Sequence, residues 1–334
     1  MGPSLEVARH AVLARYALAA EGLHWQALGD EGGFSGSEVW RGDDAAGRPV
    51  LALKAWPPTM SAERLAQIHA WMRQAAHLAF VPTVVVARGQ QTVVVEAGRA
   101  WDLTQWMPGT ADFRSHPTEG RLAAACAAVA QLHRAWRHGG SAPVRCPAVD
   151  RRLTVLRAWA TRPSLAPYAD TPIGDLLRRG CESVDRLVGP AERSLHQWAQ
   201  WPVAVGPCLC DVWHDHILFT GEAVTGVIDF GAMKVDWVGV DLARLLGDLV
   251  GDDEPAFLAG LAAYRAAGGA DLSATFVRAL DRIGALCAVM GWILRLGSEA
   301  RPGAVPKRVV LRVSQLIARL NSFPPMHLTI HSPH

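Results

Sequence analysis

The chain has 334 residues, which is more than one small hydrophobic core usually organises and therefore predicts two lobes or domains. Apolar residues make up 50% and charged residues 19% of the chain, a composition that excludes a disordered protein. The 33 basic and 31 acidic residues leave a net charge of +2, so binding to nucleic acid through a broad basic surface is not expected. The longest apolar run, residues 283–294, is shorter than the roughly 18 residues of a membrane span, so no membrane segment is expected.

The N-terminal residues and the cysteines both predict a cytoplasmic location. Glu6, Arg9, His10 and Arg15 interrupt any apolar stretch of the kind that a signal peptide needs. The six cysteines are scattered through a large chain, which is not the pattern of a disulfide scaffold and is typical of a reducing compartment.

The first hundred residues predict an antiparallel sheet with one inserted helix. After an amphipathic helix over residues 5–20, short β-branched and aromatic runs predict strands. Ser61 is a good N-cap for a helix that runs to about residue 77. Residues 84–87 and 92–96 predict a hairpin with a longer loop, and the preceding strands are expected at 25–28, 38–41 and 50–56.

Helical patterns dominate after the segment Trp106-Met107-Pro108-Gly109, which breaks the strand pattern. Two strands are expected among the helices, at 216–220 and 223–230. The fold class is therefore α+β, with a β-rich N-terminal lobe (1–105), a hinge (106–109), a larger helical lobe (110–322) and a tail (323–334). The expected helices are 119–137, 152–160, 173–187, 192–201, 238–250, 254–267, 272–296 and 306–320.

A glycine-rich turn before the strand expected at 38–41 and a lysine in the strand expected at 50–56 predict a phosphate site. Glycines let backbone N–H groups approach phosphate oxygens, and the candidates in this turn are Gly32, Gly33, Ser35 and Gly36. Lys54 stands in an apolar strand, where an unpaired ammonium is costly and a bound phosphate would be a partner. The alternatives are a plain hairpin turn and a lysine at a sheet edge that reaches water.

Glu63 is the only acidic residue between Asp44 and Glu96, so it is the only candidate on the following helix for an ion pair with Lys54. The competing interpretation is that Glu63 interacts only with the dipole of the helix, because it lies in the first turn.

Two aspartates in the second half form the more specific pattern. Asp229 ends an apolar strand and is a candidate metal ligand, and Asp211 lies 18 residues earlier, across a predicted hairpin that would bring the two together. Both could instead be turn or cap residues. The nearby Cys208, Cys210, His214 and His216 also allow a zinc site, although their spacing fits no usual zinc finger.

These motifs resemble the aminoglycoside phosphotransferase and choline kinase family, which are small-molecule relatives of the protein kinases. The family's catalytic loop reads roughly H-G-D-x-H-x-x-N-[IL]-L and its metal strand I-D-[FW]-x; Asp211, Ile217-Leu218 and residues 227–230 match them. Asp241-Leu242-Ala243 and Leu132-His133-Arg134-Ala135-Trp136 resemble two further family motifs. The resemblance implies a two-lobed kinase-like fold that transfers phosphate from ATP with Mg²⁺. Asp211 would be the catalytic base, Asp229 the metal ligand, and Lys54 with the glycine turn the phosphate-binding groups.

The sequence departs from the family at four positions of the catalytic loop. Leu209 and Cys210 replace His-Gly, Trp213 replaces the second His, and His216 replaces the Asn that would be a metal ligand. Because imidazole suits softer metals than Mg²⁺, we expect His216 to act as a metal ligand that favours Mn²⁺. The alternative function is a catalytically impaired nucleotide- or ligand-binding protein with the same fold.

The phosphate acceptor is expected to be a small molecule with a hydroxyl group. Seven acidic residues stand between residues 229 and 254 against two basic ones, which favours a cationic acceptor such as an amino sugar or an aminoalcohol if they line the site. Most of them could equally be helix caps or solvated side chains. Neither nucleic acid nor a membrane is expected as a partner, and the sequence does not indicate an oligomeric state.

Overall fold

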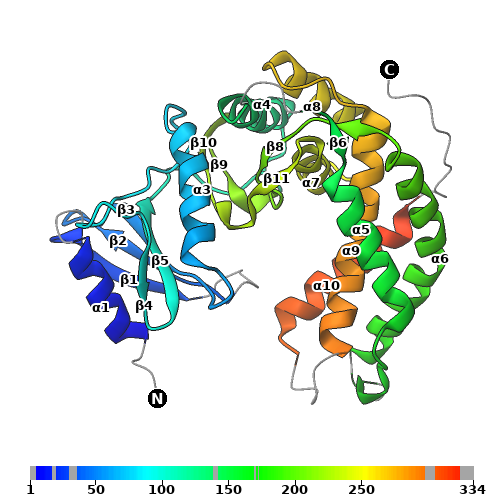
Figure 1. Ribbon diagram of the computed structural model, residues 1–334, viewed down its shortest axis with the longest axis horizontal. Helices are drawn as coiled ribbons and strands as arrows, with labels where there is room; N and C mark the ends of the chain where they lie inside the picture. Colours follow the sequence, from blue (N-terminus) through cyan, green and yellow to red (C-terminus); the bar gives the residue numbers. More distant parts are fainter. Residues whose placement is uncertain are drawn as a thin grey trace. The chain divides into compact units, whose positions relative to one another are not determined.

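The computed structural model describes residues 5–16, 20–29, 36–137, 142–168, 171, 173–297 and 305–323 (Figure 1). The chain forms two compact units. Unit 1 comprises residues 1–137, 211–234 and 267–269, and unit 2 comprises residues 138–210, 235–266 and 270–334. Unit 1 thus continues past the predicted hinge at 106–109 and includes the segment with Asp211 and Asp229.

A five-stranded antiparallel sheet forms the β-rich part of unit 1, in the order β1-β2-β3-β5-β4. The first three strands lie where the sequence predicted them. The strands are β1 (His24–Gly29), β2 (Glu38–Asp43), β3 (Pro49–Ala55), β4 (Val94–Glu96) and β5 (Arg99–Gln105).

The predicted hairpin between residues 84–87 and 92–96 is wrong. Val84 makes only an isolated bridge to Thr104, and β4 pairs with β5 instead. The connection is Ala97-Gly98, and both residues have positive φ angles, 50° and 71°. Two consecutive positive φ angles are the geometry of the tight turn that best fits the twist of two paired strands, so this two-residue connection forms a hairpin with β5.

The two faces of the unit 1 sheet are covered by different helices. Helix α1 (Leu5–Arg15) contributes Ala8 and Val12 to a core cluster with Leu53. Helix α3 (Ala62–Gln74) packs Leu65 against Trp56 on the other face, as strand alternation requires. As predicted, Ser61 caps α3, because its hydroxyl accepts a hydrogen bond from the Arg64 N–H at 3.2 Å.

The rest of unit 1 carries the two aspartates of the predicted site. Strands β9 (Ile217–Thr220) and β10 (Ala223–Val227) form the predicted second hairpin, and β10 packs on helix α4 (Glu119–Ala135). The Val227 N–H donates to the carbonyl of Phe80 at 2.8 Å, and Thr110 and Phe219 form a bridge. These bonds join the hairpin to the earlier part of unit 1.

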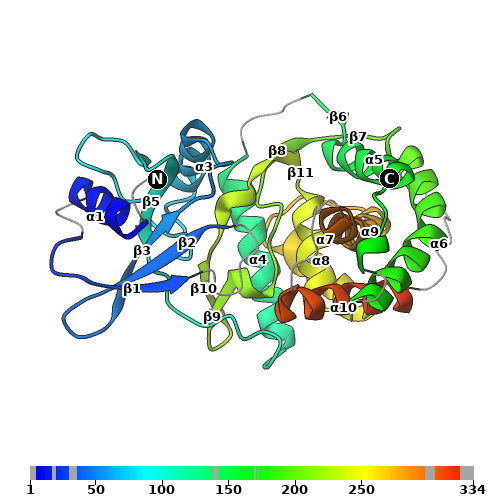
Figure 2. The same ribbon diagram turned by 90° about the horizontal axis from the view of Figure 1, so that it is seen from below.

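Helix α9 (Ala274–Gly297) is the centre of unit 2, where it packs against helices α5, α6, α7 and α10 (Figure 2). Helix α5 begins at Pro147, five residues earlier than predicted, because proline is favoured in the first turn. The unit also contains short strand pairs, β6 (Val144–Arg145) with β7 (Pro202–Val203) and β8 (Val205–Cys208) with β11 (Lys234–Trp237). The remaining helices are α5 (Pro147–Ala158), α6 (Gly174–Trp198), α7 (Gly239–Leu249), α8 (Glu254–Ala266) and α10 (Lys307–Ser322).

The helices predicted over 173–187 and 192–201 are one continuous helix, α6, with Pro190 inside it. Leu187, Ala191 and Leu195 are all buried, so one apolar stripe continues through the proline. Packing of this stripe outweighs the hydrogen bond that the proline removes. Among the described helices, none combines the length and the apolar character that a membrane span requires.

Candidate active site

Lys54 lies near the C-terminal end of β3, where its register partners are Val39 of β2 and Asp102 of β5. Its Nζ lies 3.0 Å from Oδ1 of Asp229. The ammonium also lies over the ring of Trp56, 3.8 Å from the centroid. The lysine side chain is only 18% exposed, so these two contacts supply the electrostatic compensation that an ammonium needs in such a position.

A buried hydrogen-bond chain holds the Trp56 indole in place. The Trp56 Nε1–H donates to Oδ1 of Asp102 at 2.9 Å, and Oδ2 of Asp102 lies 2.9 Å from Nε2 of His69 on α3. All three side chains are buried, and His69 is fully inaccessible. Because the indole face meets the ammonium of Lys54, this chain fixes the direction in which the lysine points.

Asp229 follows β10 and has a left-handed backbone conformation, with φ 57° and ψ 66°. Such a conformation is unfavourable for most residues other than glycine, although aspartate adopts it more readily than most, and residues of this kind are enriched at functional sites. Burial acts to raise the pKa of Asp229, but the Lys54 ammonium and the Gly231 N–H more than cancel this effect, so the pKa lies below its ordinary value. The carboxylate therefore stays ionised, as a ligand for a cation must be.

Gly231, two residues after Asp229, lies against the same indole. A Cβ atom at Gly231 would come within 2.4 Å of the Trp56 ring, so no other residue fits without movement. Trp56 thus contacts both the Lys54 ammonium and the loop that carries Asp229.

Asp211 is exposed at the start of the loop that leads to β9. The residue before it, Cys210, has a positive φ angle of 65°. The resembled family has glycine at this position, and the backbone conformation gives the physical reason. The residue directly before Asp211 thus has a backbone conformation that is unfavourable for any residue with a side chain.

His216 is held by hydrogen bonds on both ring nitrogens. The Trp213 Nε1–H donates to Nε2 of His216 at 2.9 Å, and Nδ1 lies 2.7 Å from the carbonyl oxygen of Asp211. An indole N–H can only donate, so Nε2 is the acceptor and Nδ1 carries the proton that is donated to Asp211. The Nε2 atom lies 3.7 Å from Oδ2 of Asp229.

The donor set of the site suits a divalent cation at Asp229. A carboxylate oxygen is the ligand that Mg²⁺ and Mn²⁺ prefer, and the Asp229 side chain is 40% exposed and accessible to an ion. His216 could join it only if Nε2 exchanged its bond from Trp213 for a metal. Its predicted role as a metal ligand stays a prediction, because the structure gives that nitrogen another partner.

Of the other predicted residues, Glu63 does not pair with Lys54 in the structure. It is exposed at the start of α3, where hydrogen bonds from its own N–H and from the Ser61 hydroxyl lower its pKa. The acid that pairs with Lys54 is Asp229. Gly36 has a positive φ angle of 70° and is exposed, as a phosphate-binding turn would require, whereas the predicted Gly32, Gly33 and Ser35 lie outside the described residues.

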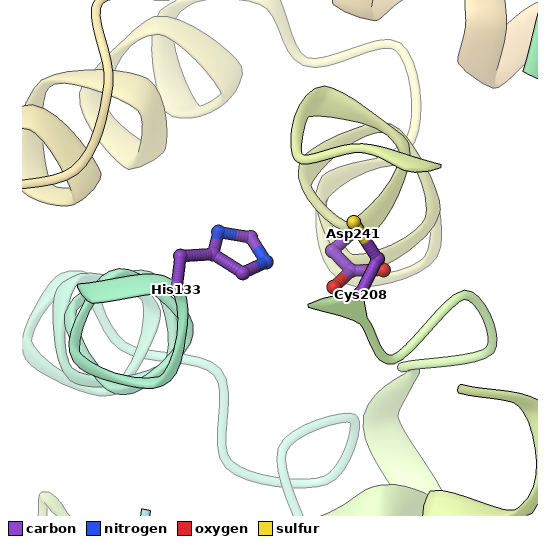
Figure 3. A group of neighbouring side chains, drawn as sticks. All are labelled: His133, Cys208 and Asp241. Carbon is purple, nitrogen blue, oxygen red and sulfur yellow. The ribbon is translucent and has the colours of Figure 1, made fainter. Parts of the chain in front are cut away.

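In unit 2, Asp241 stabilises the backbone turn at Leu209 and Cys210. Its carboxylate is fully buried and accepts hydrogen bonds from the N–H groups of Leu209 at 2.8 Å and Cys210 at 2.7 Å. Figure 3 shows Asp241 beside Cys208, with His133 drawn from α4 of unit 1. The two hydrogen bonds hold the backbone turn that precedes Asp211.

The zinc site that Cys208, Cys210, His214 and His216 allow is not supported. The Cys208 thiol is within hydrogen-bond distance of the Asp236 carbonyl, and burial raises its pKa well above the ordinary value. In the protein alone the thiol is therefore protonated and already has a hydrogen-bond acceptor. Both ring nitrogens of His216 are also occupied.

Trp56, Asp102 and His69 were not predicted as site residues. Alternation along β3 places Trp56 on the same face as Lys54, and that signal alone could have pointed to it. Asp102 could not be found, because its strand, β5, was itself not predicted. His69 shows no sequence signal that distinguishes it from an ordinary buried histidine.

The chain is similar to known proteins in sequence and in fold. The model of the phosphotransferase enzyme family matches residues 26–275. No curated protein sequence matches the chain.

Several solved structures share the fold. A spectinomycin phosphotransferase in complex with ADP and spectinomycin is similar with a TM-score of 0.65 and 10% identity, over 95% of this chain and 98% of that chain. A choline/ethanolamine kinase family protein from Mesorhizobium loti has a TM-score of 0.62 and 19% identity, over 96% and 95%. An amicoumacin kinase in complex with AMP-PNP, Ca²⁺ and Ami has a TM-score of 0.61 and 13% identity, over 95% of this chain and 96% of that chain. The likeness extends over almost the whole of each chain.

Proposed function

Because the chain belongs to the phosphotransferase enzyme family, we propose that it transfers the γ-phosphoryl group of ATP to a hydroxyl group of a small molecule. The observation that carries the proposal is the contact between Lys54 and Asp229 at 3.0 Å, in the unit that also holds Asp211. A phosphate-binding cation, a metal-binding carboxylate and an exposed acid are the groups that phosphoryl transfer needs. The solved relatives with AMP-PNP or ADP support a nucleotide as the phosphate donor.

In this proposal, each residue has one task. Lys54 donates hydrogen bonds from Nζ to phosphate oxygens, with the backbone N–H groups of the turn at Gly32, Gly33, Ser35 and Gly36 around them. A carboxylate oxygen of Asp211 accepts the proton of the acceptor hydroxyl and orients its oxygen towards the phosphorus. Asp229 would hold Mg²⁺ or Mn²⁺, which supplies neutralisation of phosphate charge when bound.

A second candidate function is nucleotide or ligand binding without catalysis. The observation that favours it is the pair formed by Trp213 and His216, which occupies the nitrogen that would have to replace the family's asparagine oxygen. A protein of this kind would bind ATP through Lys54 and still lack turnover.

The acidic residues between 229 and 254 give little support to a cationic acceptor of the aminoglycoside or choline type. Asp236 pairs with Arg151, Asp252 with Arg282 and Glu254 with Arg278. Asp229 pairs with Lys54, Asp241 accepts from the backbone of Leu209 and Cys210, and Asp253 accepts from the Ala256 N–H. We therefore propose an acceptor that has a hydroxyl group and that does not need to carry a positive charge.

The test combines nucleotide binding with turnover. Thermal shifts with ATP, ADP and GTP, with Mg²⁺ or Mn²⁺, should show stabilisation that Lys54→Ala abolishes. Release of ADP is then measured against a panel of hydroxyl acceptors. Asp211→Asn should keep the nucleotide shift and lose at least about a hundredfold in turnover, because it removes the base and leaves the phosphate contacts intact. Turnover by Asp211→Asn at the parent rate refutes the catalytic assignment, and nucleotide binding with no turnover on any acceptor favours the second candidate.

A further inference from the structure

Arg99, the first residue of β5, joins neighbouring segments at one end of the unit 1 sheet. Its Nη1 donates to the carbonyl oxygen of Gly36 at 3.1 Å and to that of Trp56 at 3.3 Å. Gly36 belongs to the glycine-rich turn before β2, and Trp56 directly follows β3. One guanidinium nitrogen therefore connects the turn to the strand that carries Lys54.

The register of the sheet explains how these groups come together. Glu38, at the start of β2, lies opposite Ala55, the last residue of β3, so the chain that leads into β2 passes the end of β3. The Trp56 N–H donates to the carbonyl of Ala100 at 2.9 Å, so the pairing of β3 with β5 continues for one more residue. Arg99 comes directly before Ala100, and from this position its side chain reaches both carbonyl oxygens.

Arg99 forms no ion pair within the part of the chain that the structure describes. This holds even for Glu96, its register partner across the turn between β4 and β5. The side chain is partly exposed, so water can solvate the charge. The bonds that the guanidinium makes go to backbone carbonyls, and its role in the protein alone is to link two backbone segments.

Trp56 is the residue that connects this link to the phosphate-binding lysine. Its ring lies 3.8 Å from Nζ of Lys54, and its indole N–H is fixed by Asp102. The same residue accepts the hydrogen bond from Arg99 through its carbonyl oxygen. Because Lys54 and the turn at Gly36 are both held to Trp56, the separation between the turn and the lysine is restrained.

We infer that Arg99 is a positioning residue of the nucleotide site, which holds the Gly36 end of the turn in place relative to Lys54; the inference rests on the proposed phosphotransferase function. Backbone N–H groups bind phosphate well only if they are already ordered, because ordering a loose loop on binding reduces the affinity. Glycines increase this need, since they lose more conformational freedom than any other residue. The restraint acts on the phosphates of the nucleotide and not on its base or sugar.

The experiment uses the full chain with Mg²⁺ and compares ATP with adenosine, which has the same base and sugar and no phosphate. Dissociation constants are measured by titration calorimetry for the parent, Arg99→Met and the control Arg88→Met. Arg88 is an exposed arginine of the same unit, and among the described residues its side chain bonds neither Gly36 nor Trp56. We expect the dissociation constant for ATP to rise about tenfold in Arg99→Met. The values for adenosine, and those of the control with both ligands, should change by less than about twofold.

Salt separates the loss of a fixed position from the loss of a charge. Attraction between exposed charges is screened by salt, so an effect of charge alone should shrink between about 0.05 M and about 0.5 M KCl. The ratio of the ATP dissociation constants of Arg99→Met and the parent should instead stay constant over this range, because salt does not restore the hydrogen bonds to the two carbonyls.

A second variant tests the link to the turn itself. Gly36→Ala places a side chain at a φ angle of 70° without any steric contact, so it should disturb the turn and weaken ATP binding. If Arg99 acts through the same turn, the double variant should weaken ATP binding by less than the product of the two single effects.

Four results each overturn the inference: parent affinity for ATP in Arg99→Met, an equal loss for ATP and adenosine, a ratio that falls to one at high salt, or single effects that multiply in full in the double variant. An arginine that only stabilises the fold predicts the equal loss, together with a lower melting temperature.

Release of ADP from ATP with a hydroxyl acceptor is measured in parallel. ATP affinity that depends on Arg99 without release of ADP means that the proposed phosphotransfer fails while the positioning role stands. Release of ADP together with unchanged ATP affinity in Arg99→Met means that the phosphotransferase stands and the positioning role fails. If ATP does not bind to the parent, both fail.

Discussion

Replacement of Trp56 by phenylalanine tests whether the hydrogen bonds that join Trp56, Asp102 and His69 affect nucleotide binding at Lys54. The substitution keeps an aromatic ring under the ammonium but removes the Nε1–H that donates to Asp102 at 2.9 Å. A buried hydrogen bond to a charged group contributes about 2 kcal/mol, so the melting temperature of a chain of 334 residues should fall by about 3 °C. The phenyl ring is also a weaker partner for the Lys54 ammonium, 3.8 Å away in the parent, so the dissociation constant for ATP should rise about threefold to tenfold.

Trp71→Phe on α3 is the matched control. The Trp71 ring is also buried and also carries a cation, Arg64, but its indole makes no hydrogen bond to any described carboxylate. Asp102→Asn should lose stability as Trp56→Phe does, and the double variant should lose less than the sum of the two. Calorimetric melting and nucleotide titration give both quantities. Equal effects of Trp56→Phe and Trp71→Phe on stability and on ATP affinity would refute the assignment of Trp56 as the positioning residue for Lys54.

Four further predictions follow from single contacts. Gly231→Ala should weaken ATP binding, because its Cβ would lie 2.4 Å from the Trp56 ring; unchanged affinity would mean that the loop moves freely. Cys210→Gly should raise the melting temperature, since φ is 65° at this position, and a fall would contradict the strain. Burial raises the pKa of Cys126 from 9.0 to about 12. The folded thiol therefore keeps its proton while the unfolded one loses it, and stability should fall by about 1.4 kcal/mol per pH unit above pH 9, with a shallower slope in Cys126→Ala. His216→Asn should shift nucleotide stabilisation towards Mg²⁺ over Mn²⁺, and an identical metal preference in both proteins would mean that His216 binds no metal.

The sequence predicted the elements whose patterns are local and missed those that depend on tertiary contacts. Alternation and the Ser61 cap were enough to place β1, β2, β3 and α3. Strand β5 was missed because Asp102 interrupts its apolar pattern, and that aspartate is tolerated only because Trp56 and His69 bond to it. A partner 33 or 46 residues away leaves no local signal in the sequence.

The candidate site shows the same division. Lys54, Asp211 and Asp229 stand out in the sequence because each is a polar residue in or beside an apolar strand. Lys54 pairs with Asp229 and not with Glu63 because of a tertiary contact between residues that are 175 positions apart in the chain, and a local pattern does not show such a contact. The partners of Arg151, Asp236 and Glu254 likewise come from the packing of helices, and they removed the support for a cationic acceptor that the acid count had suggested.

The contact between Lys54 and Asp229 has a consequence for how the site accepts its ligand. In the protein alone, the lysine compensates the carboxylate and the indole of Trp56 compensates the lysine, so neither charge is left alone in a poorly hydrated position. A nucleotide phosphate offers Lys54 a stronger anionic partner, and a divalent cation offers Asp229 a stronger cationic one. If both arrive together, each residue exchanges one partner of opposite charge for another and no charge is stranded. If the phosphate arrives without the cation, Asp229 loses its partner.

Binding of ATP should therefore depend strongly on the metal in the parent and much less in Asp229→Asn, where the neutral amide needs no counter-ion. Calorimetric titration of both proteins with ATP, with and without Mg²⁺, measures this difference, and an equal dependence on the metal would show that the two partners are not exchanged together.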